Sequence, residues 1–167
     1  MNGSDQLVEA ERIRTLKGYG ALDTPNEPEF DIIVHKAQFA IQVPIVLVSL
    51  IDENRQWFKA RIGLDVTETP RCISFCTHAL FRTEMLIIPD ASQDGRFATN
   101  PLVTHAPYIR FYAGAPLKAP GGARIGTLCA IDTRPRSGLS NAQITTMEGL
   151  AAETIATMER RRRRLTV

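Results

Sequence analysis

The chain has 167 residues, of which 44% are hydrophobic and 23% are charged, and its formal net charge is +2. This composition is close to the globular average, which excludes wholesale disorder, and the length fits a single domain. The charge is uneven, because Arg160–Arg164 together with Glu159 contribute +4 and the rest of the chain therefore carries −2. That distribution argues against a uniformly basic surface for nucleic acid.

Neither a membrane span nor a secretion signal is expected. The longest nearly unbroken apolar run, Val43–Ile51, contains Pro44 and is about half as long as a membrane-spanning helix. Acidic Asp5 and Glu9 precede any apolar run at the N-terminus. An odd number of cysteines, three, without such a signal argues against a disulfide scaffold. We therefore expect a reduced, cytoplasmic domain.

Two helices are expected before the first strand. Apolar residues recur at helical spacing over Leu7–Lys17, and Gly18 is a stop signal. After a linker at residues 23–28, a second apolar stripe begins near Glu29. The acidic side chains of Glu29 and Asp31 suit the positive end of that helix dipole.

The period then changes to that of strands. Ile45–Ile51 is β-branched and almost continuously apolar, which indicates a strand buried on both faces. A tight turn at residues 52–55 leads into an alternating segment, Gln56–Ile62, so we expect a β-hairpin. One face of the second strand would carry Trp57, Lys59 and Arg61, and the other Phe58, Ala60 and Ile62.

Shorter elements and a second hairpin follow. The pattern predicts a short helix at 74–81, a strand at 85–88 and an irregular stretch at 90–107. We expect Asp90–Val103, within this stretch, to form the lid or rim of a pocket. The second hairpin comprises residues 109–119 and 124–132.

The order of these elements predicts the fold class. Ser140 caps a long helix that runs to the arginines. Because hairpins dominate and βαβ crossovers are largely absent, we expect an α+β domain with helices packed on an antiparallel sheet. The single domain, residues 1–167, divides into an N-terminal helix and lead-in (1–22), a core (23–139) and a C-terminal helix with a basic end (140–167).

A set of short segments carries a family resemblance. They are Leu22–Pro25, Val48–Asp52, Arg55–Lys59, Ser74–Cys76, Asp94–Phe97 with Asn100–Pro101, Arg110–Leu117 and Gly126–Asp132. In this order and spacing they resemble the GAF domain family of small sensory modules, over Glu11 to about Ala152. The sequence looks most like the GAF domain at the N-terminus of sensor histidine kinases and diguanylate cyclases.

This resemblance implies a fold and a function. The fold would be a six-stranded antiparallel sheet with helices on both faces, a pocket on one face, and the N- and C-terminal helices packed together on the other. The domain would sense a small molecule in signal transduction, for example in a two-component system with a histidine kinase. It would not be an enzyme itself, and would pass its ligand state through the terminal helices to an output domain or partner. The ligand stays unnamed, because GAF pockets hold chemically diverse molecules.

Alternation along residues 109–119 predicts one polar and one apolar face. Arg110, Tyr112 and Gly114 supply a cation, a phenol and a gap, as in a site for a polar ligand. Arg110 would bind a carboxylate or phosphate, or alternatively pair with Asp90 or Asp94. Asp94 also suits the cap of a short helical turn. The apolar face carries Phe111, Ala113, Ala115 and Leu117. The predicted ligand contacts are Phe75, Cys76, Asp90, Asp94, Phe97, Arg110, Tyr112 and Cys129.

The cysteines allow a rival, enzymatic interpretation. With Ser74 as a helix cap, Cys76 falls in the first turn, where its thiol pKa would be lowered. If Cys129 met it in space, the pair would serve a redox enzyme of the free methionine-R-sulfoxide reductase type. The cysteine spacing does not match that family, and the alternative is that Cys76 is a small buried hydrophobe beside Phe75. We expect no metal site, because CxxC and HxxxH pairs are missing. The cofactor is unknown, since bilin, haem and cyclic-nucleotide signatures are missing too.

Heptad-spaced apolar residues mark the C-terminal helix. Ile144, Ala151, Met158 and Leu165 recur every seven residues. Such a stripe would cover the sheet and leave a seam for a partner helix, so we expect a homodimer through the N- and C-terminal helices with its axis near Met158. The alternatives are a solvated helix end or attraction of the arginine block to nucleic acid or a membrane surface. We expect no nucleic-acid partner and no membrane span.

Overall fold

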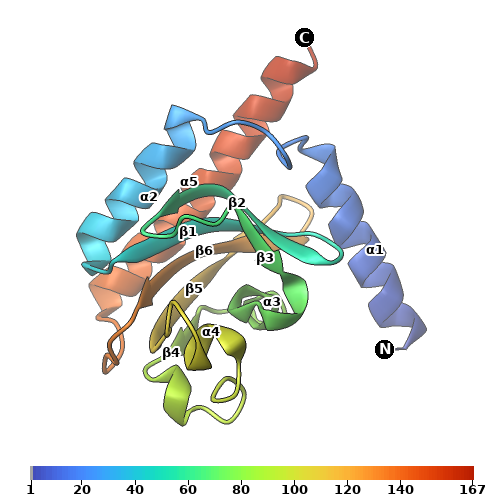
Figure 1. Cartoon of the computed structure of the whole chain (residues 1–167). Coiled ribbons are helices and arrows are strands. Elements are labelled where there is room, and N and C mark those ends of the chain that lie inside the picture. Colours follow the sequence, from blue (N-terminus) through green and yellow to red (C-terminus); the bar gives the residue numbers. More distant parts are fainter. Residues whose placement is uncertain (1) are drawn as a thin grey trace.

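The computed structural model describes residues 2–167, and at its centre is a six-stranded antiparallel sheet (Figure 1). The strand order is β3-β2-β1-β6-β5-β4. The predicted α+β class with a six-stranded antiparallel sheet is therefore confirmed. The strands are β1 (Ile45–Ile51), β2 (Arg55–Ile62), β3 (Glu68–Pro70), β4 (Leu86–Ile88), β5 (Phe111–Lys118) and β6 (Arg124–Asp132).

Helices cover both faces of this sheet (Figure 1). On one side, which we call the helix face, α2 and α5 pack against each other and against the central strands. On the other side, the pocket face, lie the short helices α3 and α4 with their connecting loops. The helices are α1 (Gly3–Gly18), α2 (Pro28–Ile41), α3 (Phe75–Ala79), α4 (Pro101–Thr104), α5 (Asn141–Leu165) and the 3-10 turns η1 (Arg71–Ile73) and η2 (Ala91–Gln93).

Side-chain caps set the helix ends. The Asn2 side chain accepts a backbone N–H in a capping box, so α1 begins at Gly3, before the predicted start. Ser140 caps α5 as predicted. Ser74 caps α3 as predicted, but that helix ends at Ala79, earlier than expected. The irregular stretch at 90–107 also contains η2 and α4, which the sequence pattern did not reveal.

The helix face holds the larger of two apolar cores. β1 is buried along its whole length, as predicted. The alternation predicted for β5 is also confirmed, since Phe111, Ala113, Ala115 and Leu117 all join this core. Tyr112 faces the other way and belongs to the smaller core on the pocket face. The sheet thus separates two environments strand by strand.

The alternation predicted for β2 is wrong in its second half. The register between β1 and β2 shifts after Val48, where a β-bulge places Lys59 opposite no residue of β1. Phe58 therefore faces the pocket, whereas Ala60 joins Trp57 in the core of the helix face. The bulge changes which residues of β2 reach each face, and period-2 counting cannot reveal it.

A buried lysine joins three segments on the helix face. The Lys59 side chain is fully buried, and its Nζ donates hydrogen bonds to Thr24 Oγ1 and to the Pro25 carbonyl, each at 2.8 Å. The same ammonium group contacts Glu27, which also accepts a hydrogen bond from Arg161 Nε at 2.7 Å. Two of the segments used for the family resemblance, Leu22–Pro25 and Arg55–Lys59, are thus held together away from the pocket.

The terminal helices differ from the prediction in one respect. The pair on the helix face is α2 and α5, whereas α1 lies beside the end of the sheet where β6 begins (Figure 1). α1 meets α5 through Tyr19, whose hydroxyl donates to Glu159 at 2.6 Å. The dimer axis predicted near Met158 is wrong, because this side chain is 1% exposed inside the chain's own core. The inner stripe of α5 covers the sheet and is not a free seam.

Candidate functional site

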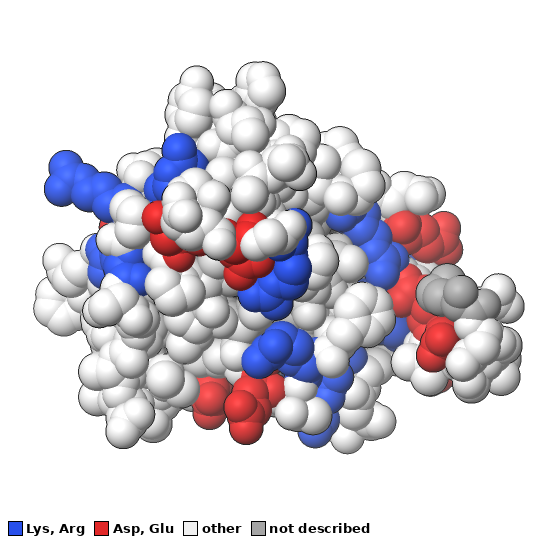
Figure 2. All heavy atoms as spheres, turned by 90° about the horizontal axis from the view of Figure 1, so that it is seen from below, with Lys and Arg blue, Asp and Glu red and all other residues white. Residues whose placement is uncertain are grey.

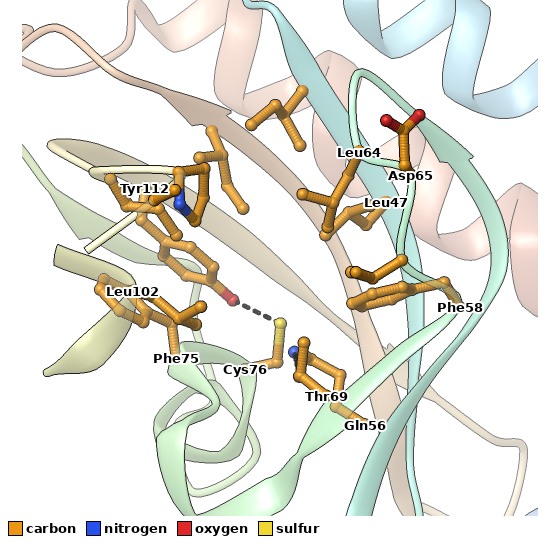
Figure 3. Close-up of a pocket in the computed structure, with 16 residues that line it drawn as sticks. Leu47, Gln56, Phe58, Leu64, Asp65, Thr69, Phe75, Cys76, Leu102 and Tyr112 are labelled. Carbon is orange, nitrogen blue, oxygen red and sulfur yellow. Dashed lines mark hydrogen bonds between the residues drawn. The ribbon is translucent and has the colours of Figure 1, made fainter.

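A cavity of about 360 Å³ opens on the pocket face (Figure 3). Its walls come from distant parts of the chain because strands, α3 and two loops converge there. Leu47 of β1 and Phe58 of β2 line one side, and Tyr112 of β5 with Phe75 of α3 lines the other. The loops add Leu64, Asp65, Val66, Ala106 and Pro107 at the rim, and α4 adds Leu102. The lining is mainly apolar.

Few polar groups in the cavity are available to a ligand. Gln56 is occupied on both sides, since its Nε2 donates to Thr69 Oγ1 and its Oε1 accepts from Ser74 Oγ, each at 2.9 Å. Asp65 is the one charged side chain among the described lining residues, and no Lys, Arg or His joins it. A neutral or cationic ligand therefore suits the cavity better than an anion.

The surface around this face carries charges of both signs in small mixed groups. Figure 2 views the molecule from below, the side on which α3 and α4 lie in Figure 1, and much of the visible surface is uncharged. Where charges occur, acidic and basic side chains are neighbours, as in the pair between Asp94 and Arg96 at 2.8 Å. The field on this side thus does not gather anions.

A pair of buried thiols lies at the base of the cavity. The Sγ atoms of Cys76 and Cys129 are 3.9 Å apart. The Tyr112 hydroxyl donates to Cys76 Sγ at 3.2 Å (Figure 3). Ser49 Oγ lies 3.9 Å from Cys129 Sγ. Thr127 pairs with Ser49 across the two strands and is also fully buried. These five side chains form a polar cluster without a charged member.

The two thiols differ in acidity. Burial tends to raise the pKa of Cys76, but hydrogen bonds from the Cys129 thiol and neighbouring hydroxyls outweigh it and lower the pKa below the ordinary value. Burial and the neighbouring Cys76 thiol raise the pKa of Cys129 well above that value. Burial likewise raises the pKa of Tyr112, which therefore stays a hydrogen-bond donor. Cys76 is the thiol of this pair that ionises first.

Gly114 allows the tyrosine to reach the thiol. The Tyr112 ring folds back over the residue two positions along the same face of β5. A Cβ atom at Gly114 would lie 2.3 Å from the Tyr112 hydroxyl oxygen. The gap predicted at Gly114 is therefore present in the backbone, but it is filled by Tyr112 rather than left for a ligand.

The predicted site residues separate into two groups. Phe75, Cys76 and Tyr112 line the cavity, and Cys129 contacts Cys76 from behind. Phe97 stacks on Phe75 with ring centroids 4.2 Å apart and supports that wall from outside the lining. The structure thus brings these five residues together, and their contact with a ligand stays a prediction.

Three charged residues predicted for the site lie elsewhere. Arg110 precedes β5, and its Nη1 donates to the carbonyl of Val103 in α4 and to that of the preceding residue, Ile109, each at 3.0 Å. The ion pair proposed for it with Asp90 or Asp94 is not formed. Asp90 accepts from the hydroxyl and backbone N–H of Ser92 at the start of η2, and Asp94 pairs with Arg96. Asp94 also accepts the backbone N–H of Arg96, in the predicted role of a turn cap.

Several lining residues were not predicted from the sequence. Leu47 and Phe58 had a usable signal, since both point to the face opposite the helix core in their strands. Asp65 and Val66 had none, because they lie in the loop between β2 and β3, where no period applies. The same is true of Pro107 at the other rim.

Two further properties of the described chain bear on function. None of its helices combines the length and the apolar character that crossing a bilayer requires. Within residues 2–167, no cluster of three or more His, Cys, Asp or Glu side chains is placed to hold a metal ion.

Comparison with known proteins gives a family and a fold. The family model for the GAF domain matches residues 26–157. A cyclic di-GMP phosphodiesterase of Pseudomonas aeruginosa is 42% identical over 132 residues, which are 79% of this chain and 22% of that protein. The chain thus spans about a fifth of the length of this relative.

Solved structures share the fold at low identity. The GAF domain of a phosphoenolpyruvate-protein phosphotransferase from Coxiella burnetii matches with a TM-score of 0.67 at 14% identity, covering 96% of this chain and 98% of that one. A type II free methionine-R-sulfoxide reductase from Thermoplasma acidophilum matches with a TM-score of 0.64 at 11% identity, covering 80% and 92%. At such identities the likeness is one of fold.

Proposed function

The chain belongs to the GAF domain family, and we propose that it is a small-molecule-sensing regulatory domain of a signalling protein, without catalytic activity of its own. The observation that carries this proposal is the apolar cavity of about 360 Å³ on the pocket face. Its volume lies at the lower end of the range of roughly 300–1,000 Å³ typical of ligand pockets. Such a role is consistent with the GAF family and with the similarity to part of a cyclic di-GMP phosphodiesterase. It is also consistent with the cytoplasmic location that we predict.

The ligand that fits best is small, largely apolar, and neutral or cationic. A cyclic dinucleotide carries two phosphate charges, and the described lining offers no cation to meet them. We therefore do not assign to this cavity the nucleotide that gives the Pseudomonas aeruginosa relative its name. Asp65 at the rim would favour a ligand with an amine or another hydrogen-bond donor at one end.

α1 offers a route from the pocket face to the helix face. Arg71 of η1, close in sequence to the cavity residues of α3, pairs with Glu9 of α1 at 2.5 Å. Beyond the other end of α1, Tyr19 bonds to Glu159 of α5. We propose that a ligand-dependent shift of η1 and α3 reaches α5 along this path, and then an output domain or partner.

The proposed homodimer requires a contact on the outside of the helix pair. Met158 and the other buried residues of α5 cover the sheet, but Gly149, Ala152 and Ala156 are exposed on its outer side. Two copies would approach closely there because the side chains are small. Light scattering of the chain should give twice 18.5 kDa, and Ala152→Glu should reduce it to the monomer without loss of helix content. A monomeric wild type would remove the dimer but leave the pocket.

A neutral fluorescent probe tests the sensing proposal directly. We expect a naphthalene ketone such as prodan to bind the reduced protein saturably, with one site per chain. Val66→Trp should block the mouth and weaken binding at least about tenfold, which corresponds to about 1.4 kcal/mol. Val66 is 48% exposed, so this variant should fold. Thr67→Trp, on the exposed neighbour outside the lining, is the matched control and should bind as the wild type does. Equal binding by both variants would place the probe elsewhere and contradict the proposal.

A second candidate function is reduction of a small sulfoxide by Cys76 and Cys129. The 3.9 Å between the two sulfur atoms favours it. Free methionine sulfoxide, however, is a zwitterion, and the described cavity has no cation for its carboxylate. Turnover of this substrate with a thioredoxin-type reductant would establish the enzyme and overturn the non-catalytic proposal.

A further inference from the structure

The thiol pair has a property that ligand sensing does not use. Cys76 and Cys129 lie in the uncharged polar cluster of Ser49, Tyr112 and Thr127, and all five side chains are at most 2% exposed. The Thr127 hydroxyl is buried without a hydrogen-bond partner at good geometry among the residues that the structure describes. We propose that Cys76 and Cys129 form a reversible disulfide and that the oxidant is a small neutral hydroperoxide entering through the cavity. This inference rests on the cavity and the thiols, not on a bound ligand.

Access divides the roles of the two cysteines. Cys76 lines the cavity, so an entering molecule meets its sulfur directly (Figure 3). Cys129 is 0% exposed on β6 and is not part of the lining. Cys76 is therefore the thiol that attacks, and Cys129 is the one that resolves. Cys72 is exposed on η1, outside the lining, and is not part of this pair.

The separation of the two sulfur atoms permits a disulfide bond after a small movement. A disulfide requires about 2.05 Å between the sulfur atoms, so a separation of 3.9 Å must shrink by about 2 Å. Rotation of the Cys76 side chain toward β6 would withdraw its sulfur from the cavity wall. The hydroxyl of Thr127 is free to turn toward a new acceptor in the rearranged cluster.

The absence of charge selects a disulfide over a bound metal ion. The described residues place no third Cys, His, Asp or Glu beside the pair. Two thiolates on a monovalent ion would leave a net charge buried beside neutral hydroxyls, whereas a disulfide leaves none. The same reasoning selects a neutral oxidant, because the lining offers no cation to an anionic one.

The chemistry balances with the hydroperoxide as the only co-reactant. The Cys76 sulfur attacks the terminal oxygen, the S–O bond forms, the O–O bond breaks, and the alkoxide leaves as an alcohol with the proton of the Cys76 thiol. The Cys129 sulfur then attacks the sulfenic acid at Cys76, the S–S bond forms, and hydroxide leaves as water with the Cys129 proton. Two thiols lose two electrons, and the hydroperoxide gains them.

Tyr112 is placed to assist the first step. Its hydroxyl donates to Cys76 Sγ at 3.2 Å and would stabilise the thiolate that attacks. The titratable groups that face Cys76 are Cys129 on β6 and Tyr112 on β5, and the remaining neighbours are the hydroxyls of Ser49 and Thr127. Loss of the Tyr112 hydroxyl should shift the pH–rate profile of oxidation upward, an effect that a purely structural role would not produce.

The experiment treats the reduced chain carrying Cys72→Ser with cumene hydroperoxide and maps disulfides without reduction. We expect a Cys76–Cys129 link that dithiothreitol reverses. In Cys129→Ala, Cys76 should stop at a sulfenic acid that dimedone traps. Tyr112→Phe should slow the link about tenfold near neutral pH, as one unit of thiol pKa implies. Val66→Trp should slow cumene hydroperoxide more than hydrogen peroxide, because only the larger oxidant needs the open mouth.

Three results would overturn the proposal. They are oxidation confined to Cys72 in the wild type, irreversible sulfinic acid at Cys76 without the link, and no reaction at Cys76. Prodan binding to the reduced protein is measured separately. Failure of the sensor proposal would then leave the cross-linking result intact, and the reverse also holds.

Discussion

The two faces of the sheet use polar residues in opposite ways. On the helix face, the buried side chains of Lys59 and Arg161 are both paired with the half-buried carboxylate of Glu27. On the pocket face, the buried polar groups around Cys76 are thiols and hydroxyls, and none carries a formal charge. The buried charges on the helix face therefore serve the fold, whereas the groups suited to chemistry at the cavity are neutral.

This contrast has an energetic basis. A buried ion pair adds little net stability over an apolar core, but removing one partner leaves a charge without compensation. Burial acts to raise the pKa of Glu27, and hydrogen bonds from Lys59 and Arg161 outweigh it, so that the pKa is lowered and the carboxylate stays ionised. The helix face is therefore intolerant of single changes, whereas neutral groups on the pocket face can rearrange at lower cost.

The largest expected effect comes from removing the Glu27 carboxylate on the helix face. Glu27→Gln should lower the free energy of unfolding by about 3–5 kcal/mol, because it leaves the fully buried Lys59 without its anion. Urea denaturation measures this change. The double variant Glu27→Gln with Lys59→Met should recover part of the loss, since it removes the uncompensated charge.

An exposed ion pair provides the control for this prediction. Glu29 pairs with Arg164 at 2.9 Å, and their side chains are 42% and 57% exposed. Glu29→Gln should therefore change stability by less than about 1 kcal/mol. If Glu27→Gln and Glu29→Gln lowered the free energy of unfolding equally, burial of Lys59 would not make its ion pair more important for stability than an exposed one.

The second prediction concerns a substitution on the pocket face that changes no charge. Gly114→Ala places a Cβ atom 2.3 Å from the Tyr112 hydroxyl oxygen, so the ring must move and lose its hydrogen bond to Cys76. We expect a loss of about 1–3 kcal/mol in the free energy of unfolding, as for other overpacked sites. Thermal unfolding and the near-ultraviolet tyrosine signal report the two parts of this effect.

The turn glycine Gly121 is the matched control. A Cβ atom there meets nothing within 4 Å. Gly121→Ala should leave both stability and the tyrosine signal close to those of the wild type. If Gly114→Ala behaves in the same way, the Tyr112 ring does not depend on the gap.

The sequence predicted the fold better than the site, for a physical reason. Hydrophobic alternation along β5 placed Phe111 and Tyr112 on the correct opposite faces, because burial of one face is what stabilises a strand. The same logic failed in β2, where a bulge moved Ala60 to the helix face. Periodicity therefore predicts a strand's faces as long as the backbone stays regular.

The site depended on information that periodicity lacks. Phe75, Cys76 and Tyr112 were found because they lie on regular elements or beside a recognisable cap. Asp65 and Val66 reach the cavity from a loop whose path is set by the whole fold. Charge was misleading, since Arg110 and Asp94 looked like ligand contacts but bond to their own local backbone.

The third prediction concerns α1, where the two faces meet. Hydrogen bonds from Arg12 and Arg71 outweigh burial and hold the pKa of Glu9 at about 2. A lowered folded-state pKa contributes stability above the unfolded-state value, and this is lost as the pH falls toward the folded-state value. Wild-type stability should thus fall between about pH 4.5 and pH 2 by about 1–2 kcal/mol more than that of Glu9→Gln, after allowing for solvent screening.

Unfolding measured over this pH range separates the contribution of Glu9 from those of other carboxylates. Glu11 is the control, because its pair with Arg14 is exposed. Glu11→Gln should follow the wild-type pH profile. A Glu9→Gln profile that is parallel to the wild type would show that the contact between α1 and η1 is too weak to transmit a signal between the faces.

The smallest expected effect comes from the one arginine that the sequence placed in the site. Arg110 donates to the backbone carbonyls of Val103 and Ile109 and does not line the cavity, so Arg110→Ala should lower stability by only about 1 kcal/mol. Prodan is neutral, so its binding should not depend on the charge of Arg110. We expect its affinity for this variant to lie within about twofold of the wild-type value, a change below about 0.5 kcal/mol. Lys118→Ala, an exposed change at the far end of β5, is the control for nonspecific effects of lost charge. If Arg110→Ala abolished binding while Lys118→Ala did not, the guanidinium would have to turn into the cavity when it is occupied. The contrast between paired charges on the helix face and an uncharged polar cluster on the pocket face would then not extend to ligand binding.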